Sequence, residues 1–243
     1  MSTATGKWVW LAVLVVLLLA PFIGLYPVFM MKALCYAIFA CAFNLLLGYT
    51  GLLSFGHAAF LGAAAYATGW LVRTAGWSPE LGVLAGTAVA AAIGLGVGLL
   101  AIRRHGIYFA MITLALAQMV YFVCLQAPFT GGEDGLQGVP RGNLFGIIPL
   151  ASDVTMYFVV LAVFVSVFAL IVRIVHSPFG QVLKAIRENE PRAISLGYDV
   201  DRYKLLAFVI SASLARLAGS TKPLVFQLAS LTDVHWHPSG QAA

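Results

Sequence analysis

Apolar residues follow one another along this chain in long blocks and do not alternate with polar ones. A block of about 20 mainly apolar residues is long enough for a helix to cross the hydrocarbon core of a bilayer, whereas a membrane β-strand would show alternation. The predicted spans are residues 8–25, 28–47, 52–72, 81–102, 107–127, 154–175 and 205–221. We therefore expect an all-α, polytopic transmembrane helical bundle of about seven spans that forms one domain over residues 1–243.

Composition supports a membrane setting, because only 9% of the residues are charged and 61% are apolar. A soluble domain carries about 25% charged residues to wet its surface. With the N-terminus in the cytoplasm, nine of the Lys and Arg residues in loops fall on the cytoplasmic side and three on the outer side. That asymmetry predicts a cytoplasmic N-terminus. It also explains the net charge of +5 without a nucleic-acid partner.

The strongly polar stretch is the loop at residues 176–204, and it shows helical order. Ser177 is a suitable N-cap and Pro178 suits the first helical position. Apolar residues then recur at helical spacing up to Ile186, so a short amphipathic helix is predicted. A second turn at residues 191–196 should end at Gly197, before Asp199 and Asp201 cap the next helix. Such a helix can lie on lipid or dock on a cytoplasmic partner, and its pattern alone favours neither.

Two features of the spans involve small or polar residues. The segment 48–60 is rich in glycine, which predicts a tight turn or a broken helix, and it contains His57. An ionisable residue inside a membrane is a functional candidate, although a neutral imidazole bonded to a neighbouring helix is an equally good interpretation. A stripe of small residues allows close helix packing, either within the chain or between subunits. Its glycines are Gly82, Gly86, Gly94 and Gly98.

The motifs expected of an enzyme or a metal centre are not found in the sequence. There is no G-x-x-x-x-G-K-[ST] phosphate loop, no G-x-S-x-G and no H-E-x-x-H. Neither His57 nor the pair His235 and His237 has a set of ligands with metal-site spacing. We therefore expect no catalytic residue, no metal and no cofactor, and any ATP hydrolysis would be performed by other subunits.

Four stretches give the chain a resemblance to a known family. They are GYTGLLSFGHAAFLGAAAYATGWL at 48–71, GIYFAMITLALAQM at 106–119, TGGEDGLQGVP at 130–140 and SPFGQVLKAIRENEPRAISLGYDVDRYKLLAFVISA at 177–212. The chain resembles the permease subunits of high-affinity branched-chain amino acid ABC importers, and the M-type subunit in particular. The resemblance implies inward passage of leucine, isoleucine, valine or a similar amino acid across a bacterial inner membrane.

The resemblance also implies partners: a second permease subunit in a homo- or heterodimer, cytoplasmic ATP-binding subunits, a periplasmic substrate-binding protein, and membrane lipid. The loop at 176–204 would be the coupling segment that docks on an ATPase. The expected coupling residues are Phe179, Gly180, Arg187, Glu188, Glu190, Ala193 and Gly197. The expected translocation-pathway residues are Ser54, Gly56, His57, Thr130, Gly131 and Gly132.

The coupling signature shared by such importers is degenerate here, as is usual for this family, and the sequence departs from the family pattern at two other points. In the coupling signature only Ala193 and Gly197 keep the register, and Glu190 is the nearest candidate for the acidic position. Arg216 stands where a small residue is usual, about 17 Å into its span, so we expect it to face a polar cavity or another chain. Lys222 and Pro223 should end that span, and the polar residues 232–243 suggest a permease that is incomplete at its C-terminus.

Two other functions fit the same pattern of spans. A permease of this architecture could carry urea or short amides instead of amino acids. A secondary transporter driven by an ion gradient would need acidic residues inside the membrane, and the stretches 8–72 and 81–132 contain none.

Overall fold

The computed structural model of the protein describes residues 3–24, 26–102, 106–144, 146, 148–230 and 234. The seven long helices are α1 (Thr3–Leu19), α2 (Pro27–Thr50), α3 (His57–Arg73), α4 (Pro79–Ala101), α5 (Ile107–Gln126), α6 (Asp153–Val175) and α9 (Val200–Phe226). The two short helices are α7 (Pro178–Glu188) and α8 (Glu190–Ser195). Single 3-10 turns are η1 (Ala20–Ile23), η2 (Pro128–Thr130) and η3 (Gly132–Asp134). The expected all-α class is confirmed.

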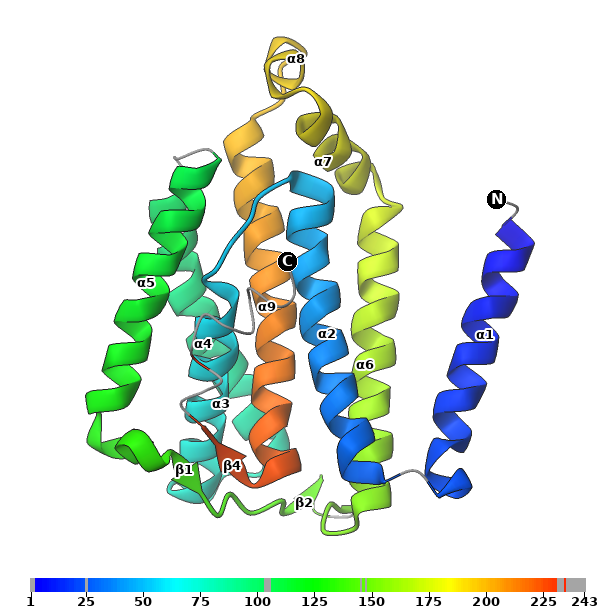
Figure 1. The fold of residues 1–243 in the computed structure, drawn as a ribbon, viewed down its shortest axis with the longest axis vertical. Coiled ribbons are helices and arrows are strands. Elements are labelled where there is room, and N and C mark those ends of the chain that lie inside the picture. Colours follow the sequence, from blue (N-terminus) through cyan, green and yellow to red (C-terminus); the bar gives the residue numbers. More distant parts are fainter. Residues whose placement is uncertain are drawn as a thin grey trace.

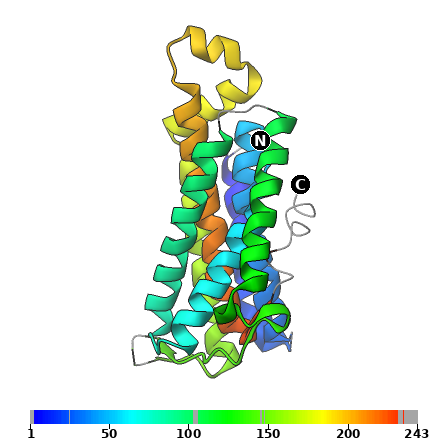
Figure 2. The same ribbon diagram turned by 90° about the vertical axis from the view of Figure 1, so that its left-hand side faces the viewer.

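The long helices run up and down side by side, and their connections gather at the two ends of the bundle (Figure 1). Helices α7 and α8 extend beyond one end, and Figure 2 shows the same end in profile. The opposite end carries four two-residue strands, β1 (Leu136–Gln137), β2 (Asn143–Leu144), β3 (Ile148–Pro149) and β4 (Leu228–Ala229). Strand β1 pairs antiparallel with β4, and β2 pairs antiparallel with β3. The first pair ties the loop after α5 to the segment after α9.

Each of the seven predicted spans corresponds to one helix, but the helices differ in length. Five of them, α2, α4, α5, α6 and α9, are long and apolar enough to cross a membrane. Helices α1 and α3 have 17 residues each and are shorter than that. Helix α1 lies on the outer side of α6 (Figure 1), where the ring of Trp10 is 4.6 Å from that of Phe168.

The connection between α2 and α3 is a break inside the bundle. We expected a span to begin at residue 52, but the helix begins at His57, because Gly51 ends α2 with a φ of +73°. Freed backbone N–H groups are then satisfied locally: Leu52 donates to the Thr50 hydroxyl at 3.4 Å and Gly56 to the Ser54 hydroxyl at 3.3 Å. Irregular backbone is tolerated in a membrane bundle when side chains supply these partners. The structure thus has an irregular connection over residues 51–56 between two separate helices, and not a tight turn or one interrupted helix.

Helix α9 continues further than the sequence predicted. We expected Lys222 and Pro223 to end it near residue 221, but it runs to Phe226 with Pro223 inside it. A proline in a helix clashes with the carbonyl four residues earlier, and here that residue is Gly219, which has no side chain to hinder adjustment. The Lys222 ammonium group donates to the Tyr36 hydroxyl at 3.1 Å, so its charge is not left unsolvated.

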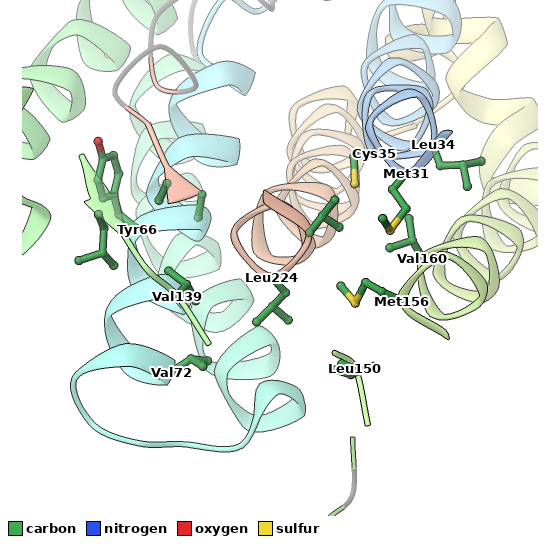
Figure 3. Packing of buried hydrophobic residues seen from close by; sticks show 14 of the residues in the cluster. Met31, Leu34, Cys35, Tyr66, Val72, Val139, Leu150, Met156, Val160 and Leu224 are labelled. Carbon is green, nitrogen blue, oxygen red and sulfur yellow. The ribbon is translucent and has the colours of Figure 1, made fainter. Parts of the chain in front are cut away.

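The core lies where α9 is surrounded by α2, α3, α4 and α6. Figure 3 shows one part of it, in which Met31 of α2 points toward Met156 and Val160 of α6. Helix α9 contacts α3 closely, because Gly219 lies against the carbonyl of Leu61 and a Cβ there would overlap that oxygen. Close approach through small residues is how membrane helices gain packing energy when lipid is as apolar as they are.

Candidate functional site

The α7 helix forms as the sequence predicted, and its apolar side faces the bundle. The Ser177 hydroxyl accepts from the N–H of Gly180 at 3.4 Å, and Pro178 is the first helical residue. Leu183 and Ile186 are buried. Gly180 lies so close to the carbonyls of the preceding α6 turn that a Cβ would overlap them. The apolar face of α7 therefore packs against the rest of this chain.

Two contacts fasten the exposed side of α7 to the end of α2. The Arg187 guanidinium donates to the carbonyl of Gly48, and the Lys184 ammonium group lies 5.5 Å from the Tyr49 ring centre. A cation at a helix C-terminus is favourable because the last carbonyls lack helical partners. A cavity of about 770 Å³ opens beside these contacts. Its lining residues are Asn44, Gly48, Tyr49, Lys184, Arg187 and Glu188.

Helix α8 is capped at both ends. Its N-cap is Asn189, whose side chain accepts from the N–H of Arg192 at 3.0 Å. At its C-terminus Gly197 has a φ of +87°. The N–H of Gly197 donates to the carbonyl of Ile194, and the N–H of Tyr198 donates to the carbonyl of Ala193. This is a Schellman motif, which favours glycine at the left-handed position. The turn predicted at residues 191–196 is thus a helix that starts one residue earlier and ends one residue earlier.

Glu190 makes an ion pair inside the chain. Its carboxylate is 2.7 Å from the Lys204 ammonium group, whose side chain is only 5% exposed. Lys204 lies in the first turns of α9, so the pair joins the start of α8 to α9. The acidic position that we expected to contact a partner therefore serves, in this structure, to hold the loop together.

The part of the loop that faces away from the bundle is apolar at its tip. Ile194 is 58% exposed and Leu196 is 67% exposed, beside Tyr198 at 40%. We call these three residues the loop tip. It lies at the end of the molecule farthest from the strands (Figure 1). Of the expected coupling residues, Phe179 stacks on Tyr203 and Ala193 is buried, so neither belongs to this exposed surface.

His57 lies at the start of α3 in a buried polar cluster. Its Nε2 atom is 2.9 Å from the Ser211 hydroxyl of α9, and that hydroxyl donates to the carbonyl of Ala42 on α2. Ala42 is eight residues before the end of α2, about 12 Å along the helix. The imidazole thus joins three helices well inside the bundle. Ser54 and Gly56 are buried beside it, so the first three expected pathway residues do lie together.

Arg216 is fully buried on α9 one to two turns beyond this cluster. Its guanidinium carbon is 5.0 Å from the Phe60 ring centre, and the group presses against Gly94 of α4. Within the described part of the chain, none of its three side-chain nitrogens has a hydrogen-bond partner. A central arginine costs roughly 2.5–3.5 kcal/mol to insert, and a cation–π contact returns about 0.5–2 kcal/mol. The contact offsets only part of the cost.

The glycine stripe of α4 is used inside this chain. Gly82 and Gly86 lie against Thr68 and its neighbours on α3. Gly94 and Gly98 lie against Arg216 and Phe208 on α9. Of the two interpretations of the stripe, packing within the chain is the one that the structure supports.

The second group of expected pathway residues lies at the other end of the bundle. The Thr130 hydroxyl donates to the carbonyl of Ala127 at 2.6 Å, and Gly131 and Gly132 continue the turn with positive φ. These three residues lie in the turns that follow α5 and are distant from His57 along α3. Thr130 also borders a mainly apolar cavity of about 440 Å³ between α3, α4 and α5.

The described residues contain no candidate metal site, because no three His, Cys, Asp or Glu side chains among them come together. His235 and His237 lie outside the described residues, as do Arg103 and Arg104.

The sequence that forms this multi-pass bundle and its protruding loop matches a known protein family. The family model "Branched-chain amino acid transport system / permease component" matches residues 25–239. The chain belongs to this family. The family is a permease component and not a catalytic domain, and the chain is accordingly a multi-pass membrane protein.

Two relatives in the family bear the name high-affinity branched-chain amino acid transport system permease protein LivM. The one from Salmonella typhimurium strain LT2 is 30% identical over 250 residues, which cover 90% of this chain and 57% of that protein. The one from Escherichia coli strain K12 is 30% identical over 213 residues, which cover 76% of this chain and 49% of that protein. The chain thus spans about half the length of these relatives. No solved structure matches it significantly.

Sequence reasoning missed several residues that this family member uses. Ser211, the partner of His57, was overlooked because a single serine in an apolar span gives no local signal. Lys204, the partner of Glu190, was counted only as a loop charge. The loop tip was missed because Ile194 and Leu196 break the amphipathic spacing, and that break was itself the signal that could have revealed it.

Proposed function

We propose that this chain is a pore-forming permease subunit of an ABC importer that carries branched-chain or similar amino acids into the cell. The observation that carries the proposal is the loop tip, an exposed apolar surface on a helical loop whose other side is fastened to the bundle. Exposed apolar side chains at the end of a polar loop are typical of a protein interface. A helix lying on lipid would instead turn its apolar face outward, whereas the apolar face of α7 is buried on this chain.

The proposed partner at the loop tip is a cytoplasmic ATP-binding subunit. The distribution of charge supports this orientation. Arg173, Lys184, Arg187, Arg192, Arg202 and Lys204 all lie at the loop end of the bundle. Lys32, Arg73 and Arg141 lie at the end that carries the strands. Under the positive-inside rule this distribution supports the proposal that the loop is cytoplasmic and that the membrane is a bacterial inner membrane. Closure of paired ATPases would push the loop and, through it, α6 and α9.

The remaining proposed partners follow from the family and from the outer surface of the bundle. Large apolar side chains are exposed along α4 and α5, which suits contact with lipid and with a second permease subunit. A periplasmic substrate-binding protein would deliver the amino acid at the strand end. The name of the relatives supports a branched-chain substrate, with urea or a short amide as the alternative.

The experiment replaces one residue of the loop tip in the complete assembly. Ile194→Glu should place a charge in the docking surface, reduce co-purification of the ATP-binding subunits and lower leucine-dependent ATP hydrolysis at least tenfold. Trp77→Glu is the matched control, because Trp77 is 46% exposed in the turn between α3 and α4 at the opposite end. It should leave co-purification of the ATP-binding subunits unchanged. Equal behaviour of the two variants would remove the support for docking at the tip.

The same assembly distinguishes the alternatives of mechanism and substrate. Uptake by proteoliposomes should require ATP and should persist when ion gradients are dissipated. An ion-driven carrier would show the reverse. Competition of labelled leucine uptake by valine, isoleucine, urea and acetamide then identifies the substrate class, and only the aliphatic amino acids should compete.

A further inference from the structure

The interface between α3 and α9 contains two buried polar groups whose bonding capacity is not used. One is Nδ1 of His57 and the other is the guanidinium of Arg216, which lack hydrogen-bond partners among the described residues. Both side chains are fully buried, and both contact Phe60. Buried polar groups in native structures are nearly always paired, so each unpaired one calls for a functional explanation.

The two groups are chemically complementary to different parts of one ligand. Since the Ser211 hydroxyl gives its proton to Ala42, it must accept from Nε2–H of His57. Nδ1 is then the unprotonated nitrogen and can only accept a hydrogen bond. Arg216 can only donate, through a planar fork that fits a carboxylate. The interface therefore offers one acceptor and one carboxylate-binding fork.

The surroundings of the two groups suit an amino acid. The imidazole ring centre is 5.6 Å from Phe43, 5.7 Å from Phe60 and 5.5 Å from Phe208. Aromatic faces attract an ammonium group and also accept aliphatic side chains. The apolar cavity of about 440 Å³ shares only α3 with this interface, since it is lined by Ala63 of α3 and by Ile93 of α4, next to Gly94.

The counter-charge for Arg216 does not come from a described span. The acidic side chains that the structure describes lie at the two ends of the bundle, at Glu80, Asp134, Asp153, Glu188, Glu190, Asp199 and Asp201. The Lys222 ammonium group, by contrast, has the Tyr36 hydroxyl and the Tyr36 ring as neighbours. Arg216 is thus a buried cation for which the described bundle provides no anionic partner.

We infer that Arg216 and His57 bind the backbone of the transported amino acid, with the carboxylate on the Arg216 guanidinium and the ammonium group donating to Nδ1 of His57. This inference rests on the proposed function and names the site at which that function would hold its substrate. The interface is closed in this structure, so the amino acid enters as α9 separates from α3. Helix α9 follows directly from the α8 loop and α3 follows the irregular segment 51–56, so both helices can move.

The test uses the full chain in nanodiscs with ¹⁵N-labelled arginine, and Arg216→Met assigns the Arg216 resonance. Leucine and isovalerate, which both carry a carboxylate, should shift that resonance, and leucinamide should not. Arg216→Met is expected to insert at least as well as the parent, because it removes a buried charge. An Arg216 resonance that ignores all three compounds, or that moves equally with leucinamide, overturns the site.

Transport by the complete assembly provides the second readout. Arg216→Met and His57→Leu should each raise KM for leucine at least tenfold while ATP-driven uptake remains measurable. His57→Asn is the matched control, since its carbonyl oxygen falls close to the position of Nδ1, and it should keep KM within about threefold. ATP-driven uptake with unchanged KM in Arg216→Met would overturn this site and leave the proposed function intact. Absence of ATP-driven uptake in the parent would refute the function itself.

One further variant tests whether the chain pairs Arg216 internally. Asp233 lies outside the described residues and is the acidic residue that follows α9. Asp233→Asn should leave both the Arg216 resonance and KM unchanged. A shift of the resonance in Asp233→Asn as large as that caused by leucine would show an internal ion pair and would overturn the inference.

Discussion

Polar groups of the α7–α8 loop have partners within the chain, whereas two polar groups at the α3–α9 interface have none among the described residues. In the loop, Ser177, Asn189 and Asp199 each cap a helix start, and Glu190 pairs with Lys204. At the interface, Arg216 and Nδ1 of His57 have no such partner in the described structure. We expect a loop whose polar groups all have partners to move as a rigid unit. An interface with unpaired polar groups can instead form hydrogen bonds with a ligand.

The same contrast appears in how the two regions are packed. The loop is joined to the bundle by polar and aromatic contacts such as Phe179 on Tyr203, at 5.7 Å between ring centres. The interface is joined by backbone contact at Gly219 and Leu61. Three substitutions, taken from the largest expected effect to the smallest, can break or sharpen this comparison.

Gly219→Ala should have the largest effect, because its Cβ would overlap the Leu61 carbonyl, which is backbone and cannot rotate away. Overpacking of this kind costs about 3 kcal/mol in the free energy of unfolding. The measurement is unfolding by SDS in mixed micelles. The matched control is Gly96→Ala on α4, where a Cβ meets open space. It should be neutral or stabilising by up to about 1 kcal/mol. Equal unfolding of both variants would contradict close packing of α3 on α9.

Lys204→Met should have a smaller and local effect, since it removes the ammonium group that lies 2.7 Å from the Glu190 carboxylate. Breaking a fully buried ion pair costs about 3–5 kcal/mol. The side chain of Glu190 is 32% exposed, so water compensates part of the loss and we expect about 1–2 kcal/mol. Hydrogen exchange of the α8 amides should report this loss as faster exchange.

The control for Lys204→Met is another basic residue that pairs with an acid in the same loop. Arg202 is 2.8 Å from Asp199, but its side chain is 83% exposed. An exposed pair contributes about 0.2–1 kcal/mol at most. Arg202→Met should therefore change α8 exchange little. If both variants accelerate exchange equally, the buried pair does not hold the loop.

The loop could be predicted from sequence almost residue by residue, and the interface could not. Caps and turns depend on neighbours within about four residues, so Ser177, Pro178 and Gly197 indicated them directly. The interface depends on residues far apart in the chain, such as His57 and Ser211, and one sequence gives no register between helices. The end of α9 was mispredicted for the same reason: Pro223 is tolerated because of Gly219 and the packing around it.

The predicted coupling residues of the loop differ in their exposure. Glu190 pairs with Lys204 and Ala193 is buried, whereas Arg187, Glu188 and Gly197 are exposed. The large apolar side chains exposed beside them are Ile194, Leu196 and Tyr198. A sequence motif records that a segment is special, and only packing reveals which of its side chains point outward.

Gly197→Ala should cost no more stability than Lys204→Met and should have a measurable effect on coupling. Its surroundings are open, so added bulk meets nothing, and the cost arises from the φ of +87° alone. The left-handed conformation costs a residue with a Cβ about 1–2 kcal/mol. The Schellman turn would then be populated less, α8 would be joined less rigidly to α9, and fewer leucine molecules should be taken up per ATP hydrolysed. Gly197→Asn is the control, since asparagine tolerates this conformation better and should recover part of the ratio. A ratio that stays at the parent value in Gly197→Ala would mean that rigidity of this turn does not transmit the motion.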